Sequence, residues 1–314
     1  MYQISEEMTS PLAISFNKAI ERVTGTSGSG LYDQWADSLE RTYFQRTSAV
    51  RSDSSESNIL SGESTGNFYP RWSPNDSMAT YLSNRGNDYL SQTSLYVYDF
   101  ETGQSRYIAP LAVSGGAWAP DGSAIVYARR SKPNRYGSVY NDLYRYDFAT
   151  QTESRLTEGE RVKNPDWSPT DSLIVFVSSY DGTQNIELYD FTTDSVRQVT
   201  GFSSGEQVFS PRFSRDGQTI VFDVNTTFGR DIYRLDVASG NISILLDYAW
   251  DVRSPILRGD TLIFADDRTG IFNIYRRNLA TGEEHPVTNV TGGAFMPDVN
   301  ADGELLLALY ENAG

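Results

Sequence analysis

One sequence unit occurs five times along this chain and begins a sixth time, and this repetition constrains the fold more than any other feature. Each unit passes from an anchor residue through a short Ser/Pro/Asp/Gly turn into an alternating apolar run, and then into an aliphatic-Tyr-x-x-Asp run. The anchors, 42 to 49 residues apart, are Trp72, Trp118, Trp167, Phe213, Leu257 and Val299. A repeat of this length is one supersecondary unit that must bury its faces against its neighbours.

Four short antiparallel strands account for the content of one unit. Asp-Gly pairs follow the anchors at 121–122, 216–217 and 302–303, and glycine favours a tight hairpin because it adopts positive φ at no steric cost. The runs at 174–177 and 220–224 combine β-branched and aromatic residues, which is typical of strands buried on both faces. The sequence therefore predicts an all-β chain folded as a six-bladed β-propeller.

The sixth blade is expected to be incomplete. Only 15 residues follow Val299, whereas the third strand of every other unit begins 17 to 25 residues after its anchor. Residues 57–60 precede the first unit as a closing strand would, so we expect them to supply the outer strand of the last blade. On this interpretation the parent polypeptide continues beyond Gly314.

A different pattern precedes the repeats. Residues 10–24 predict a helix that Ser10 caps, Pro11 begins and Gly25 ends. An i,i+4 apolar stripe then predicts a second helix from about 31 to 46. We expect residues 1–47 to form a helical hairpin at the end of a preceding domain. The serine-rich segment 48–67 is expected to be a linker that includes the closing strand, and residues 68–314 are expected to hold the propeller repeats.

The repeated Pro-x-Trp-Ser-Pro-Asp-Gly and Ile-Tyr-x-x-Asp segments resemble those of the TolB-type, WD-repeat-like β-propellers of bacterial envelope proteins, over residues 56–314. This resemblance implies a fragment of a larger protein of the periplasm or cell envelope, acting as a non-enzymatic protein–protein interaction scaffold. The segments FNKAIERVTGTS and LYDQWADSLE resemble the tail of the zinc-peptidase-like domains that precede such propellers in some envelope proteins. Any peptidase activity would then reside in a missing N-terminal part.

Composition excludes several classes of protein. The 41 acidic and 26 basic residues give a net charge of -15, a field of the wrong sign for wrapping nucleic acid, so we expect no nucleic-acid partner. No apolar run approaches the roughly 18 to 20 residues that span a bilayer, so we expect no membrane insertion by this segment. The chain has no Cys and one His, which excludes thiol catalysis and an HExxH zinc site.

Two functions from different classes remain. The first is the non-enzymatic scaffold, for which we assign no catalytic residue. The alternative is the propeller module of a hydrolase, either a glycosidase, which needs two carboxylates over a sugar cleft, or an accessory domain of a peptidase whose GxSxG motif this sequence lacks. His285 is expected to lie on an exposed outer strand without a role in chemistry.

The variable loops indicate where a partner would bind. In a blade of four antiparallel strands, the loop between the second and third strands shares a face with the loop that leads to the next blade. The loop at 129–142 gathers residue types that are enriched at interface hot spots, namely Arg129, Arg130, Lys132, Arg135, Tyr136 and Tyr140. We predict that a protein partner binds this face through that loop; a solvated loop is the alternative.

Acidic residues at the same loops raise the question of a metal. Asp266, Asp267 and Asp223 are the candidates for a Ca²⁺ site at the channel mouth, because calcium takes carboxylate ligands. Three acids from different blades establish no coordination geometry, and solvated acidic loops are the favoured alternative. We therefore expect no cofactor.

Overall fold

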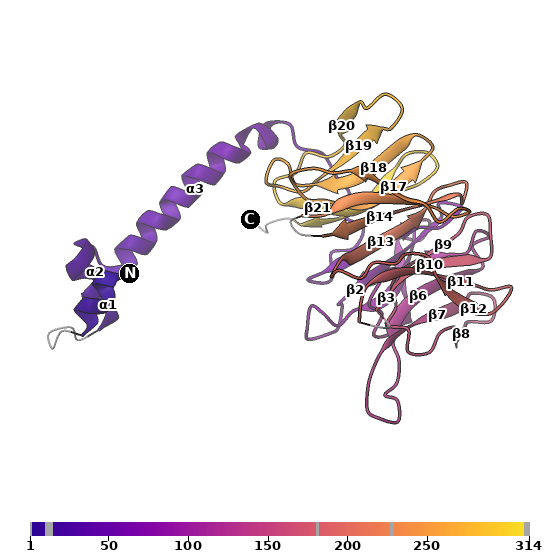
Figure 1. The fold of residues 1–314 in the computed structure, drawn as a ribbon. Coiled ribbons are helices and arrows are strands. Elements are labelled where there is room, and N and C mark those ends of the chain that lie inside the picture. Colours follow the sequence, from indigo (N-terminus) through magenta and orange to yellow (C-terminus); the bar gives the residue numbers. More distant parts are fainter. Residues whose placement is uncertain (1, 10–14, 180–181, 227–228, 311–314) are drawn as a thin grey trace. The chain divides into compact units, whose positions relative to one another are not determined.

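The structure is a computed structural model that describes residues 2–9, 15–179, 182–226 and 229–310. Two compact units divide the chain, residues 1–54 and residues 55–314. The first unit is helical and the second consists of β-sheets (Figure 1). Within the described ranges, no helix combines the length and the apolar character needed to cross a membrane.

The helical unit contains α1 (Tyr2–Met8), α2 (Phe16–Thr24) and α3 (Gly28–Ser52). Ser15 caps α2 by accepting a hydrogen bond from the Lys18 N–H, and Gly25 ends it as expected, with φ at 75°. The predicted cap Ser10 and first residue Pro11 lie outside the described residues.

The predicted helical hairpin is wrong, because the described residues before the propeller form three helices and α3 continues into the expected linker. A helix of nine residues cannot cover the apolar stripe of a helix of 25. Trp35 and Tyr43 of that stripe are accordingly more than half exposed.

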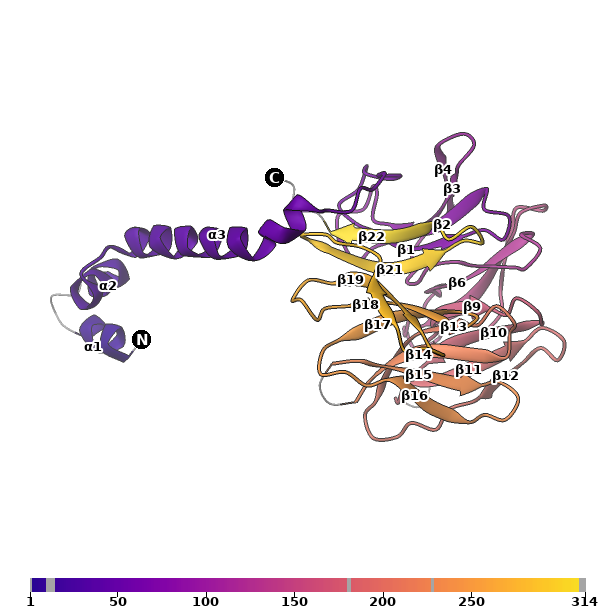
Figure 2. The same cartoon turned by 90° about the horizontal axis from the view of Figure 1, so that it is seen from above.

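Five four-stranded antiparallel sheets and one two-stranded sheet make up the second unit, and they succeed one another around a common centre (Figures 1 and 2). Each complete blade runs in chain order from its innermost to its outermost strand. The complete blades are β1–β4 (Asn67–Trp72, Met78–Ser83, Ser94–Asp99, Gln104–Ala109), β5–β8 (Ala117–Trp118, Ala124–Arg130, Asn141–Asp147, Thr152–Arg155), β9–β12 (Lys163–Trp167, Leu173–Ser178, Asn185–Asp190, Ser195–Gln198), β13–β16 (Gln207–Phe213, Thr219–Asn225, Asp231–Asp236, Ile242–Leu246) and β17–β20 (Val252–Arg258, Thr261–Asp266, Asn273–Asn278, Glu284–Pro286).

The predicted six blades are corrected to five, because β21 (Gly293–Val299) and β22 (Leu305–Tyr310) pair only with each other. Residues 57–60, predicted to close the last blade, form no strand. A fourth strand needs a third strand as its hydrogen-bonding partner, and β22 has no such neighbour among the described strands. Ser55 instead exchanges hydrogen bonds with Asn289 at the exit of the fifth blade, and Ile59 is 71% exposed.

The hydrophobic core is a series of layers between consecutive blades. Each buried cluster joins residues of two neighbouring sheets, as when Leu82 of β2 and Leu95 of β3 pack with Ile125 and Tyr127 of β6. The aromatic residue at the middle of the second strand is completely buried in four blades, at Tyr127, Phe176, Phe222 and Phe264. The expectation that one unit buries its faces only against its neighbours is met in this way.

A hydrogen-bond clamp explains why the units end in Leu-Thr or Val-Thr. The Thr288 hydroxyl accepts from the Ile274 N–H at 2.8 Å and donates to Asn273 Oδ1 at 2.9 Å. Thr200 and Thr157 make the same two contacts in the third and second blades. The clamp joins the end of the outer strand to the start of the third strand and so fixes their register.

Candidate functional site

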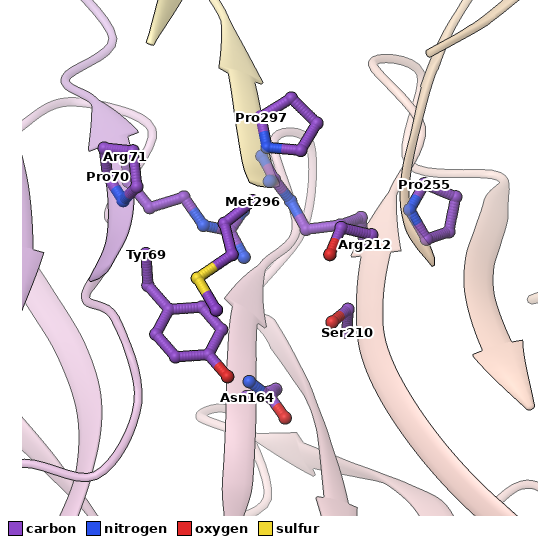
Figure 3. A pocket seen from close by; sticks show the side chains of 10 residues that line it. Tyr69, Pro70, Arg71, Asn164, Ser210, Arg212, Pro255, Met296 and Pro297 are labelled. Carbon is purple, nitrogen blue, oxygen red and sulfur yellow. The ribbon is translucent and has the colours of Figure 1, made fainter. Parts of the chain in front are cut away.

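The innermost strands of the sheets line the central channel. Five of them, β1, β9, β13, β17 and β21, are kinked at one equivalent residue. That residue has a left-handed backbone, with φ between 47° and 53°, and directly precedes a proline; the five are Tyr69, Asn164, Ser210, Ser254 and Met296. Figure 3 shows four of them around a narrow space of about 20 Å³. A left-handed non-glycine residue costs about 1–3 kcal/mol, so five together mark a position that the surrounding structure holds firmly.

Four charged side chains close the channel at the repeat position just before the anchor. Arg212 Nη2 lies 2.8 Å from Asp298 Oδ1, and Arg212 Nε lies 3.2 Å from Asp166 Oδ1. Arg71 Nη1 lies 3.3 Å from the same Asp166 oxygen. We call these four residues the channel ring. Its members come from the first, third, fourth and sixth sheets, and their charges alternate in sign.

The two carboxylates of the channel ring also tie blades together through the main chain. Asp298 accepts a hydrogen bond from the Trp72 N–H at 2.8 Å, and Asp166 accepts one from the Phe213 N–H at 2.9 Å. This site was not predicted from the sequence. Its signal is the alternation of Arg and Asp at the position before the anchor, which Ala117 and Ile256 interrupt in the other two units.

Burial sets the protonation of the channel ring. Loss of hydration raises the pKa of Asp166 to about 6, although Arg71 acts in the opposite direction. Burial likewise raises the pKa of Asp298, again against the influence of Arg71. A buried carboxylate is costly in its charged form even when it is paired. The guanidinium groups therefore compensate only part of that cost, and the site is sensitive to pH.

Beyond the channel ring the channel widens into a cavity of about 280 Å³, which we call the funnel. It opens among the first hairpin turns of the blades, on the face opposite the predicted loop. Its wall includes Trp72, Trp118 and Trp167, which stack on Phe100, Phe148 and Phe191. The charged lining residues outside the channel ring are Asp76, Arg215 and Arg258. Its volume is near the lower end of ligand pockets, which hold roughly 300–1,000 Å³.

The predicted loop connects β6 to β7 on the other face, and the structure separates its residues into two groups. Arg129 pairs with Glu153 at 2.9 Å and stacks over the Tyr144 ring at 4.6 Å. Its charge is therefore compensated by a residue of the same blade. Tyr140 lies beneath the Arg161 guanidinium at 4.9 Å. The exposed members are Arg130, Lys132, Arg135 and Tyr136, the last with 74% of its surface accessible.

The Asn134 side chain organises the tip of this loop. Its Oδ1 accepts hydrogen bonds from the Tyr136 N–H at 2.9 Å and the Ser138 N–H at 3.0 Å. The Asn134 N–H donates to the Ser138 carbonyl at 2.9 Å. Asparagine holds turns in this way because its short side chain mimics the backbone. The Arg135 guanidinium then lies 4.6 Å from the Tyr136 ring, so the tip presents a stacked cation and aromatic pair.

The three Ca²⁺ candidates are engaged separately by protein groups. Asp223 accepts from Arg230 at 2.8 Å, Asp266 from Trp250 Nε1 at 2.9 Å, and Asp267 from the Asp251 N–H at 2.9 Å. In the part of the chain that the structure describes, no group of three or more His, Cys, Asp or Glu side chains is placed to hold a metal ion.

His285 lies on β20, the outer strand of the fifth blade, as expected. Its Nε2 is 2.9 Å from Glu283 Oε1, and its side chain is half exposed. This arrangement is an exposed side-chain contact on the outer surface of the blade.

The successive sheets and the channel at their centre define a β-propeller. Residues 160–314 match the sequence profile of the TolB beta propeller domain. The Tol-Pal system protein TolB of Francisella tularensis is 24% identical over 199 residues, which cover 60% of this chain and 45% of that protein.

Enzymes also occur among the relatives. An uncharacterized peptidase of Bacillus subtilis, YuxL, is 28% identical over 127 residues, which cover 40% of this chain and 19% of the peptidase. Among solved structures, TolB from Acinetobacter baumannii is similar with a TM-score of 0.61 and 19% identity, over 73% of this chain and 55% of that one. The chain spans less than half the length of these curated relatives.

Proposed function

We propose that this chain is a non-enzymatic, TolB-like scaffold that binds a protein partner in the periplasm or cell envelope of a bacterium, as part of a larger protein. The observation that carries the proposal is the group of exposed residues at the end of β6 and in the β6–β7 loop, namely Arg130, Lys132, Arg135 and Tyr136, together with the loop tip that Asn134 holds. A preorganised loop loses little conformational freedom on binding, so its contacts contribute more fully to affinity. The similarity to TolB supports the envelope location.

The funnel supports the same class of function with a second surface. Its aromatic edges offer apolar contact area, and Arg215 and Arg258 offer directional donors for a carboxylate or a carbonyl. A few side chains of a partner would fill a volume of about 280 Å³.

Site-directed cross-linking tests the scaffold proposal. A photoreactive phenylalanine analogue at position 136 of the full natural protein is activated in cells, and cross-linked proteins are identified by mass spectrometry. We expect one envelope protein to be captured, and its yield to fall at least about five-fold in the variant Arg130→Ala/Lys132→Ala/Arg135→Ala. The matched control removes three exposed cations elsewhere, Arg197→Ala/Arg234→Ala/Arg276→Ala, and keeps the yield. Equal loss in both variants, or loss in neither, removes the loop from the binding site.

A hydrolase module is the second candidate. It is supported by the similarity to a peptidase and by Asp166, a carboxyl group with a raised pKa that lines the funnel beside Asp298. The purified protein is assayed with glycoside and peptide substrates against Asp166→Asn. Turnover that depends on Asp166 replaces the scaffold proposal, whereas turnover equal in both proteins, or none, retains it.

A further inference from the structure

Exposed apolar side chains from three different loops gather on the face that carries the β6–β7 loop. Tyr89 and Leu90 of the β2–β3 loop are 65% and 58% exposed, and Leu111 of the β4–β5 loop is 45% exposed. Tyr136 and Val139 of the β6–β7 loop are also exposed. Single exposed apolar residues are ordinary, but a contiguous group marks an interaction site.

Hydrogen bonds join the bases of these three loops. The Thr93 hydroxyl, at the end of the β2–β3 loop, donates to the Ala112 carbonyl. Ala112 in turn forms a β-bridge with Arg129, and the Arg130 N–H donates to the Leu111 carbonyl at 3.1 Å. Leu111 therefore lies between the β2–β3 loop and the base of the β6–β7 loop.

Leu111 also has an unusual backbone. Its φ is 56°, in the left-handed region that costs a bulky residue about 1–3 kcal/mol. The hydrogen bond to Arg130 helps to hold this conformation, in which an aliphatic side chain remains accessible to solvent.

A basic segment that contains no acidic residue of its own borders this apolar group. No Asp or Glu occurs between 129 and 141, although the chain has a net charge of -15. Arg130, Lys132 and Arg135 are exposed, and the described side chains include no acidic partner within ion-pair distance of any of the three. A surface with this composition attracts acidic segments that the rest of the protein repels.

We infer that this composite surface, made of Tyr89, Leu90, Leu111, Arg130, Lys132, Arg135, Tyr136 and Val139, docks an acidic polypeptide segment that carries aliphatic or aromatic side chains between its carboxylates. The inference rests on the proposed scaffold function and names the chemistry of the partner. The carboxylates meet the three cations, while the apolar side chains cover Leu90, Leu111 and Tyr136. An anionic membrane has similar chemistry, but three cations cannot offset the repulsion between a lipid surface and a protein of charge -15.

The test measures fluorescence anisotropy of short labelled peptides with the full chain. The probe alternates Glu with Leu and Phe; one control replaces Glu by Lys, and the other replaces Leu and Phe by Ser. We expect the probe to bind at least about ten-fold more tightly than either control, because each lacks one of the two required contacts. Raising the salt from about 50 to about 300 mM should weaken probe binding several-fold, since it shortens the range of electrostatic attraction.

Two variants locate the binding on the protein. Arg130→Ala/Lys132→Ala/Arg135→Ala should remove the preference for Glu over Lys, and Leu90→Ser/Leu111→Ser should remove the preference for Leu and Phe over Ser. Both variants change exposed residues, and unchanged circular dichroism melting curves establish that they fold. Arg197→Ala/Arg234→Ala/Arg276→Ala should bind as the unaltered protein does.

Equal affinity for all three peptides, or affinity that neither variant changes, overturns the inference. Binding to phosphatidylglycerol vesicles without binding to the probe overturns it in favour of a membrane-facing surface. Capture of an envelope protein at position 136 together with no peptide preference rejects this inference alone. Peptide preference without any captured protein rejects the proposed function alone.

Discussion

Arg212 Nη2 and Asp298 Oδ1 lie 2.8 Å apart although 86 residues separate them in the sequence. The contact crosses the channel and joins the fourth sheet directly to the sixth, without passing through the fifth. Arg71 and Asp166 join the first sheet to the third in the same way. The blades are therefore held at the centre as well as along their faces.

Replacing Arg212 should strongly destabilise the propeller. Arg212→Met leaves Asp166 and Asp298 buried with one cation fewer, and removing one partner of a buried ion pair typically costs about 3–5 kcal/mol. Arg215→Met, which changes an exposed arginine three residues further on, should alter the free energy of unfolding by no more than about 0.5 kcal/mol. Urea denaturation followed by circular dichroism measures both. Equal midpoints for the two variants would mean that the channel ring contributes nothing to stability.

Protonation of Asp166 should change stability in a defined pH window. Its pKa is raised to about 6 in the folded protein from a usual value near 3.8, so the folded state binds this proton more tightly than the unfolded state does. The contribution of Asp166 to stability therefore increases as pH falls from above 6 to about 4, with a slope of up to about 1.4 kcal/mol per pH unit.

Asp166→Asn isolates this contribution, because the other carboxyl groups with a raised pKa, Asp76, Glu160, Asp223, Asp231 and Asp298, remain in both proteins. Unfolding free energies are measured by urea denaturation at several pH values between 4 and 8. The difference between unaltered protein and variant should vary with pH between 4 and about 6.5, and be constant above that range. A difference that is constant throughout would place the pKa of Asp166 at its usual value.

Two glycines in equivalent hairpin turns provide a matched pair. Gly122 and Gly217 both have φ near 70°, but a Cβ at Gly122 would meet nothing within 4 Å, whereas a Cβ at Gly217 would lie 2.2 Å from Thr170 Oγ1. Gly122→Ala should cost about 1 kcal/mol from backbone strain alone. Gly217→Ala should cost at least about 1 kcal/mol more, because Thr170 must move and lose its contact with the next turn. Thermal unfolding of both variants checks the order, and the reverse order contradicts it.

The free edge of β22 should exchange its amide hydrogens quickly. Leu307 is only partly buried, whereas its counterparts Tyr127, Phe176, Phe222 and Phe264 are fully buried and belong to second strands that pair with a third strand. In a chain of residues 1–314, hydrogen–deuterium exchange at 305–310 should be at least about ten-fold faster than at 124–130. A synthetic β7–β8 hairpin, residues 141–155, should slow this exchange by pairing with β22. A hairpin with Leu143→Ser/Tyr144→Ser serves as control, and equal protection by both peptides contradicts specific pairing.

Periodic features of the sequence were sufficient to predict the strands of the five complete blades, although the number of six blades was wrong. The anchors, the Asp-Gly turns and the Leu-Thr exits each depend on contacts within one unit or with the next unit, so their spacing carries the necessary information. Gly25 was identified as a helix end for the same reason, because its role depends on local backbone geometry. The exposed position of Tyr136 also follows from its place at the tip of a long polar loop.

Features that depend on distant partners could not be predicted in this way. The channel ring brings together Arg71 and Asp298 from the two ends of the repeat array, and their meeting depends on how the sheets close around the channel. Arg129 was grouped with the binding loop because its neighbours in sequence are basic, but Glu153 on β8, two strands away in the same sheet, engages it. Residues 57–60 have the sequence of a closing strand and lack the third strand that would give them hydrogen-bonding partners.

Ties between blades that are not neighbours change the way in which this protein should unfold. Stacked repeats that contact only their nearest neighbours behave as a linear array, in which end units fray and partly folded species accumulate. Here the loss of either end sheet would leave a buried charged group at the centre with one ion-pair partner fewer. Arg71, the partner of Asp166, belongs to the first sheet, and Asp298, the partner of Arg212, belongs to the last. The channel ring therefore links sheets that are not neighbours in the sequence. The propeller should therefore unfold as one cooperative unit, because unfolding of a terminal sheet also breaks an ion pair of the channel ring and so costs additional free energy.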